Sequence, residues 1–327
     1  MNSARPLASA SFDLDNQWTY MKTHGDAGWE EFPSYLDILV PRVLQFLAER
    51  KLTITFFVVG QDAALPKNHG TLQAIAAAGH EIGNHSFSHE PWLHLYSKSR
   101  IEEEIGRTHE LINLLTGCTP RGFRGPGYSF SPTTLEVLKE RGYSYDASAL
   151  PTWIGPLARA YYFMTSEFRG AELEKRNALF GSLKDCFRPL KPHLLPSNAG
   201  EILEIPVTTM PLFRVPIHAS YIIYLSTYSP ALGLSYFRSA LRLCRLTGVQ
   251  PSMLLHPLDF LGSDDVSSLA FFPGMNLRST QKTAILAEIM DSLCDHFSVL
   301  TLGEYASHVT YLNNALLVKS RKARVVS

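Results

Sequence analysis

Apolar and amphipathic stretches alternate along the whole chain and predict a repeated order of strands and helices. Short apolar or β-branched runs, typical of buried strands, occupy residues 7–15, 53–60, 80–86, 143–148, 201–207, 252–260 and 296–302. Helix-like segments lie between them, at 39–51, 70–79, 99–117, 131–142, 234–248 and 280–296. Strands that alternate with helices in this way predict a parallel sheet covered by helices.

Several helix ends carry recognisable signals. Ser131 is suited to cap the helix at 131–142, with Pro132 at its first position and Gly142 after its end. Gly117 follows the helix at 99–117 in the same manner. In the segment 39–51, Pro41 fits the first helical turn.

The number of strands favours a closed or nearly closed sheet. About seven or eight parallel strands predict an α/β fold of the distorted (β/α)7–8 barrel kind, formed by residues 1–327 as a single domain. Residues 155–200 do not follow the strand–helix order, so we interpret them as an insertion. The polar residues of chemical interest follow the ends of strands, which is the end of a barrel that carries catalytic groups.

Composition narrows the classes of function. The chain has 327 residues, and Lys plus Arg and Asp plus Glu both number 30, so no basic field indicates a nucleic-acid partner. The four cysteines are scattered without a C-x-x-C pair, which favours reduced thiols. The first fifteen residues lack an apolar signal segment, so we expect a cytoplasmic protein, or one held peripherally on the inner membrane face.

Two histidines and two aspartates form the first candidate site. His85 and His89 are four residues apart, a spacing that places both side chains on one side if the segment forms a helical turn. Asp13 and Asp15 alternate with Leu14 at the end of the first strand, so their carboxylates face the same way. Two imidazoles and one carboxylate are typical catalytic zinc ligands, and the other acid is then free to accept a proton. The alternative for the acids is a capping or turn role.

Two further residues complete the candidate chemistry, each with a structural alternative. Arg124 follows a strand and is suited to pair with a carboxylate, or else it is a surface residue of a Gly/Pro turn. His256 ends a very apolar strand and is a candidate general acid, or else a buried core histidine. Asp259 is a possible orienting partner for that histidine.

Taken in order, these motifs resemble the polysaccharide deacetylase (NodB-like) family. Residues 11–16 read Ser-Phe-Asp-Leu-Asp-Asn where the usual motif is T-F-D-D-G, and this D-x-D form is similar to one branch of the family. Residues 85–89 match H-[ST]-x-x-H, and residues 124–128 match the Arg-containing motif. Leu254-Leu255-His256 matches L-x-H, whereas Asp146 and Trp153 fit the fourth motif only loosely. The resemblance covers about residues 8–153 and 200–306.

The resemblance implies a role for each of these residues. It implies a barrel of the family's own type and one divalent metal, expected to be Zn2+. The ligands are Asp15, His85 and His89; the general base is Asp13, oriented by Arg124; the general acid is His256. The resemblance also implies substrate contacts by Tyr128, Trp153 and Leu254. Supporting roles for Asp146 and Asp259 stay open, as does an oligomeric state.

The expected reaction is hydrolytic removal of an N-acetyl or N-formyl group from an amino sugar of a glycan or a lipid-linked sugar. Hydrolysis of a small cyclic amide and non-catalytic carbohydrate binding are the alternatives. The insertion mixes leucine and aromatic residues with Lys and Arg, and an uncharged stretch at 215–237 follows it. This pattern predicts weak contact with a membrane surface, with packing over the barrel as the alternative.

Overall fold

One mixed sheet forms the centre of the molecule. The computed structural model describes residues 5–154 and 186–312. Its strands are β1 (Leu7–Leu14), β2 (Thr55–Val58), β3 (Glu81–Asn84), β4 (Gly122–Phe123), β5 (Tyr145–Asp146), β6 (His193–Ser197), β7 (Gly200–Glu204), β8 (Ser252–Leu255) and β9 (Ser298–Leu300). They are ordered β6-β7-β5-β4-β3-β2-β1-β8, and β9 also pairs with β1.

Most strand pairs are parallel, as the alternation of strands and helices predicted. Only the β6–β7 hairpin is antiparallel among the described strand pairs. After β7, the amide of Ile205 donates to the carbonyl of Asp146 at the end of β5, and the amide of Val207 donates to that of Ala149. The amide of Thr208 donates to the carbonyl of Ser252 on β8. Irregular backbone therefore bridges the two sides of the sheet. The predicted distorted barrel is confirmed, and its strands alone form only part of the wall.

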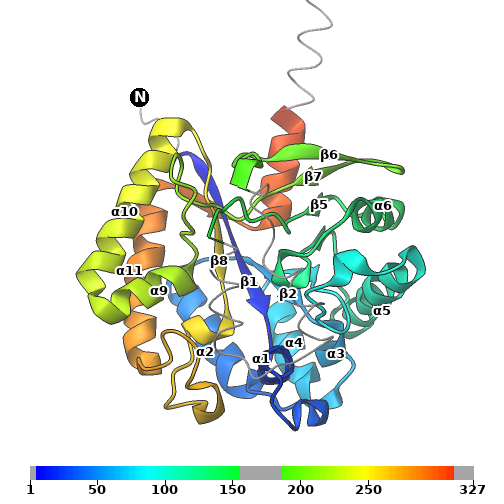
Figure 1. Cartoon of the computed structure of the whole chain (residues 1–327), viewed down its shortest axis with the longest axis horizontal. Helices are drawn as coiled ribbons and strands as arrows, with labels where there is room; N and C mark the ends of the chain where they lie inside the picture. The colour runs from blue at the N-terminus through cyan, green and yellow to red at the C-terminus, as the bar shows by residue number, and fades with distance from the viewer. Residues whose placement is uncertain (1–4, 155–185, 313–327) are drawn as a thin grey trace, which may run out of the picture.

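Helices surround the strands of the sheet (Figure 1). They are α1 (Gln17–His24), α2 (Leu36–Glu49), α3 (Gly60–Ala63), α4 (His69–Ala77), α5 (Lys98–Thr116), α6 (Pro132–Glu140), α9 (Ala219–Tyr228), α10 (Pro230–Thr247) and α11 (Ser279–His296). β1 runs through the middle, with α9, α10 and α11 on one side of it and α5 and α6 on the other (Figure 1). α1 lies at the end of the molecule toward which β1 points.

The predicted helix ends are mostly confirmed, with one exception. The Ser131 hydroxyl accepts a hydrogen bond from the amide of Thr134, and Gly117 ends α5 in the left-handed conformation. The expectation for Pro41 is wrong, because α2 begins at Leu36 and the proline lies inside the helix. The apolar periodicity visible from residue 39 therefore misses the first turn of α2.

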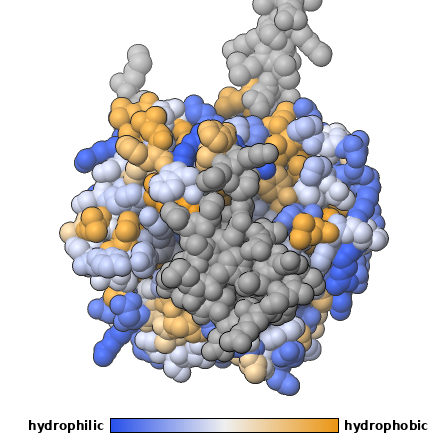
Figure 2. Space-filling model, viewed as in Figure 1, coloured by the Kyte–Doolittle hydropathy of each residue, from blue (hydrophilic) through white to orange (hydrophobic). Residues whose placement is uncertain are grey.

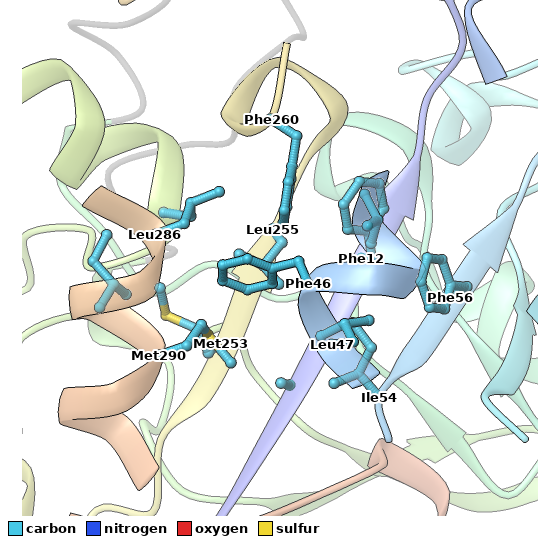
Figure 3. Packing of buried hydrophobic residues seen from close by; sticks show 14 of the residues in the cluster. Phe12, Phe46, Leu47, Ile54, Phe56, Met253, Leu255, Phe260, Leu286 and Met290 are labelled. Carbon is cyan, nitrogen blue, oxygen red and sulfur yellow. The ribbon is translucent and has the colours of Figure 1, made fainter. Parts of the chain in front are cut away.

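The main core lies between the sheet and helices α2 and α11. Phe12 of β1 stacks on Phe56 of β2 with ring centroids 5.3 Å apart, and Phe260 packs against Phe12. Figure 3 shows these rings in one cluster with Phe46 of α2 and Met290 of α11. The residues of β1 that alternate with Phe12, including Asp13, are thereby directed to the barrel interior.

Most of the predicted insertion, residues 155–185, lies outside the described residues, so the expected membrane-surface contact stays a prediction. Its remainder contains β6, which extends the sheet by a hairpin. The uncharged stretch at 215–237 forms α9 and the start of α10. Within the described part of the chain, no helix has the length and apolar character needed to cross a bilayer. On the face shown in Figure 2, apolar and polar side chains are interspersed around the grey region.

Candidate active site

A pocket lies where the carboxyl ends of the central strands meet. Its volume is about 200 Å³. It is lined by Asp13, Asp15, Thr19, Tyr20, Thr23, His85, His89, Pro91, Gly127, Tyr128, His256 and Phe272. Polar residues at or just after the ends of β1, β3 and β8 face this pocket: Asp13, His85 and His256. This is expected for parallel strands, whose carboxyl ends lie on the same side of the sheet.

Three potential metal ligands meet in this pocket. Oδ1 of Asp15 lies 2.9 Å from Nε2 of His89 and 3.3 Å from Nε2 of His85. One ligand atom from each residue lies within 4.8 Å of the other two. Nδ1 of His85 lies 2.6 Å from the carbonyl oxygen of Arg124, an acceptor that leaves Nε2 unprotonated and able to bind a metal. This donor set fits one divalent cation with a position left for water or substrate.

The two histidines are not on a helix, so the helical explanation of their spacing is wrong. They lie in the loop after β3, in which Ser86 and His89 have positive φ values of 58° and 52°. Buried Glu104 of α5 holds this loop, because one of its oxygens accepts the amides of Phe87 at 3.0 Å and Ser88 at 2.7 Å. The signal that could have identified Glu104 is a carboxylate on the apolar face of a predicted helix.

Electrostatic attraction dominates at the Asp15 carboxylate. Burial alone would raise the pKa of Asp15, but the charges and hydrogen bonds of His89 and His85 outweigh burial and hold this pKa well below its usual range. Asp15 is therefore ionised, which is the form in which a carboxylate binds a metal.

Arg124 and Asp13 form a buried ion pair beside these ligands. Nη1 of Arg124 lies 2.7 Å from Oδ1 of Asp13 and also donates to the Ser11 hydroxyl at 2.8 Å. Its Nε donates to the carbonyl of Ala147 at 2.8 Å, so backbone and side-chain contacts fix the guanidinium. The structure thus places Arg124 where the sequence predicted, and it excludes the surface-turn alternative because only 1% of Arg124 is exposed.

His256 faces Asp13 across the pocket. Its Nε2 lies 3.9 Å from Oδ2 of Asp13, and its Nδ1 is 3.1 Å from the hydroxyl of Ser220. Asp259 accepts the backbone amide of His256 at 2.7 Å and also hydrogen-bonds with Ser220. Asp259 therefore reaches the imidazole through Ser220, a residue that sequence reasoning missed. Burial lowers the pKa of the neighbouring His218 to about 3, with the charge of His256 adding to the effect, so His218 is neutral.

The predicted substrate-contacting residues do not all reach the pocket. Tyr128 lines it, with a positive φ of 63°. Leu254 is fully buried in β8, and Trp153 donates its indole N–H to the carbonyl of Phe213, so neither lines the pocket. Asp146 lies on β5, where it accepts a hydrogen bond from Ser148.

The sequence also gave no indication of the pocket wall formed by α1. Thr19, Tyr20 and Thr23 of this helix line the pocket together with Phe272 from a distant loop. The usable signal was local: Asn16 caps the helix through its side chain and Gly25 ends it in the left-handed conformation.

The fold thus brings two carboxylates, three imidazoles and a buried guanidinium together at the carboxyl end of an α/β barrel. Residues 26–145 match the family model described as polysaccharide deacetylase. The resemblance seen in the motifs is therefore confirmed over this segment. Asp13, Asp15 and His256 lie outside the matched range, while His85, His89 and Arg124 lie within it.

Curated relatives agree with this assignment. A peptidoglycan deacetylase from Helicobacter pylori is 31% identical over 133 residues, which is 38% of this chain and 44% of that protein. A peptidoglycan-N-acetylglucosamine deacetylase from Bacillus cereus is 35% identical over 103 residues, covering 32% of this chain and 36% of the relative. The chain thus spans less than half the length of each of these two relatives.

Solved structures show the same fold. A protein from Mycobacterium smegmatis, itself provisionally described as a polysaccharide deacetylase, superposes with a TM-score of 0.63 at 20% identity, covering 96% of this chain and 93% of that one. A second protein of similar description, from Pseudomonas aeruginosa PAO1, gives a TM-score of 0.59 at 17% identity, with coverages of 93% and 91%.

Proposed function

We propose that this protein is a metal-dependent hydrolase that removes an N-acyl group, most simply acetyl, from an amino sugar. The observation that carries the proposal is the juxtaposition of Asp15, His85 and His89 with the Asp13–Arg124 ion pair and His256 in one pocket. The relatives named peptidoglycan deacetylases support an N-acetylated sugar as the substrate class.

The metal requirement rests on the three ligands. A divalent ion held by Asp15, His85 and His89 would polarise the amide carbonyl and make water more acidic. Zn2+ is the ion we expect, because two imidazoles and one carboxylate with an open position are a typical catalytic zinc set. The Nδ1 contact of His85 with the Arg124 carbonyl orients that imidazole toward the site in advance.

The chain's own groups move the protons. Asp13 is placed to accept a proton from the attacking water, and Arg124 holds the carboxylate that does so at 2.7 Å. His256 lies on the other side of the pocket and is placed to donate a proton from Nε2 to the departing nitrogen. The contact of Nδ1 with Ser220 leaves Nε2 directed toward Asp13. Each proton transfer contributes on the order of 10²–10⁴ in rate.

The direct test combines metal analysis with product analysis. We expect purified protein to contain about one divalent ion per chain and to release acetate and a free amine from N-acetylated peptidoglycan fragments. Chelation should abolish release, and added Zn2+ should restore it. Full activity in protein without a stoichiometric divalent metal would contradict the proposal at its base.

A further inference from the structure

Helix α1 is joined to the loop that follows β8 by three contacts. Nε2 of Gln17 donates to the Ser268 hydroxyl at 3.2 Å. The Tyr20 ring meets Phe272 edge to face with centroids 5.2 Å apart. His24 stacks on Phe271 at 3.9 Å. Because Tyr20 and Phe272 both line the pocket, these contacts close its rim between α1 and this loop.

The same helix is also joined to the loop that carries His89. Nζ of Lys22 donates to the carbonyl of Ser88 at 2.8 Å and to the carboxylate of Glu90 at 2.7 Å. At the start of the helix, the side chains of Asn16 and Trp18 donate to Asp62 at 2.7 Å and 3.1 Å. The helix is therefore anchored at its start and tied to a neighbouring loop on each side.

The rim continues from the His89 loop to Tyr128. The backbone amide of His94 donates to the Ser129 hydroxyl at 2.9 Å, and the His94 ring makes a second contact with the same hydroxyl at 2.8 Å. Pro91 packs so closely on Gly127 that a Cβ added there would lie 2.9 Å from the proline Cβ. A continuous series of contacts thus runs from Phe272 through α1 and Pro91 to Tyr128.

We propose that this rim restricts the enzyme to a single amino sugar or the terminal sugar of a chain, with α1 as the specificity-determining element. The inference rests on the proposed function. A glycan that passes through an active site needs openings on two opposite sides. Among the described residues, no such contact joins Tyr128 to His256, so we place the entrance there and infer that a chain enters by its end.

The size of the pocket agrees with this restriction. Its volume of about 200 Å³ is below the roughly 300–1,000 Å³ of pockets that enclose drug-sized ligands. One sugar ring with its acyl group fits this scale better than several consecutive rings. The aromatic side chains of Tyr20, Tyr128 and Phe272 supply apolar surface against which a ring can pack.

The test is the position of deacetylation in a defined oligomer. Zn2+-loaded protein is incubated with an N-acetylglucosamine tetramer labelled at its reducing end, and fragment masses identify the sugars that lost acetyl. We expect loss from one terminal sugar. Equal loss from the interior sugars would overturn the inference and leave the proposed function intact. Ring opening of a small cyclic amide, with no acetate from any sugar, would overturn both, as would no hydrolysis of any substrate.

A variant that loosens the rim sharpens the test. Gln17→Ala combined with Phe271→Ala removes two contacts of α1 without altering a pocket-lining residue. The ratio of interior to terminal deacetylation should rise several-fold. Gln45→Ala combined with Leu246→Ala changes exposed residues on other helices and serves as the control. An unchanged ratio in a folded rim variant would remove α1 from the specificity argument.

Discussion

The barrel carries two pairs of buried carboxyl groups, and their surroundings are opposite. Asp13 and Asp15 face cationic or ionisable partners: Arg124 lies 2.7 Å from the first and His89 2.9 Å from the second. Asp146 and Glu204, on adjacent strands β5 and β7, hydrogen-bond with each other. One oxygen of each finds no donor elsewhere in the described part of the structure.

The two pairs therefore differ in charge. At Asp146 and Glu204, burial is the main cause that raises the pKa, and for Glu204 the charge of Asp146 raises it further. One proton shared between the two side chains satisfies both orphaned oxygens. At Asp15 the imidazoles reverse the effect of burial and lower the pKa. Burial alone yields a neutral acid, and a positioned cation yields a charged one, so charge is retained where the proposed chemistry needs it.

The largest expected effect on activity comes from removing His89, the imidazole that lies beside Asp15. His89→Ala should lose both the metal and turnover, because two ligands do not hold a divalent ion firmly. Asp13→Asn should keep the metal and lower kcat by roughly 10²–10⁴, because it removes the base alone. Elemental analysis and acetate release measure both variants. Equal metal loss in the two variants would mean that the two acids have been assigned the wrong roles.

The second prediction removes the cation from the buried Asp13–Arg124 ion pair. Arg124→Met leaves the Asp13 carboxylate buried without its cation, which typically costs about 3–5 kcal/mol of unfolding free energy. Urea unfolding measures the loss, and adding Asp13→Asn to the variant should recover part of it. Arg238→Met, which breaks an exposed pair with Glu288, is the control and should cost less than about 1 kcal/mol. Equal losses in the two Arg variants would contradict the comparison.

The smallest expected effect is on the pH dependence of stability, and it concerns Asp146 and Glu204. Because the folded pKa of Glu204 lies above its unfolded value, wild-type stability should fall as pH rises above about 4, toward the folded pKa. Glu204→Gln supplies a permanent donor to Asp146, so it should flatten this dependence and gain about 1 kcal/mol at pH 8, the net value of one hydrogen bond. Unfolding at pH 4.5 and pH 8 tests it, with exposed Glu201→Gln on the same strand as control. A pH dependence unchanged from wild type would show that the pair carries no shared proton.

Local sequence was enough to predict the position of the polar residues at the ends of strands. Asp13, His85 and His256 follow apolar runs, and parallel strands bring their carboxyl ends together whatever the details of the loops. Sequence spacing did not predict the conformation that unites His85 with His89, because it depends on Glu104, a residue of a different element. Long-range contacts of this kind leave no periodic pattern.

Helix α1 also depends on long-range contacts that could not be predicted from the sequence. Residues 17–24 lack an amphipathic pattern, and only Trp18 and Thr19 are buried in the helix. The helix depends on its capping residues and on contacts with Asp62, Glu90 and Phe272. The predicted roles of Trp153 and Leu254 came from motifs alone, and neither side chain lines the pocket.

The pairing of β1 also determines when the site can form during synthesis. This strand carries Asp13 and leads to Asp15, yet two of its three partners, β8 and β9, come from the last quarter of the chain. At a translation rate of about 5–20 residues per second, β1 waits on the order of ten to fifty seconds for β8 to be made. Because β2 and β3 are made long before β8, Asp15 can meet His85 and His89 early. His256, which follows β8, joins the pocket only after this delay.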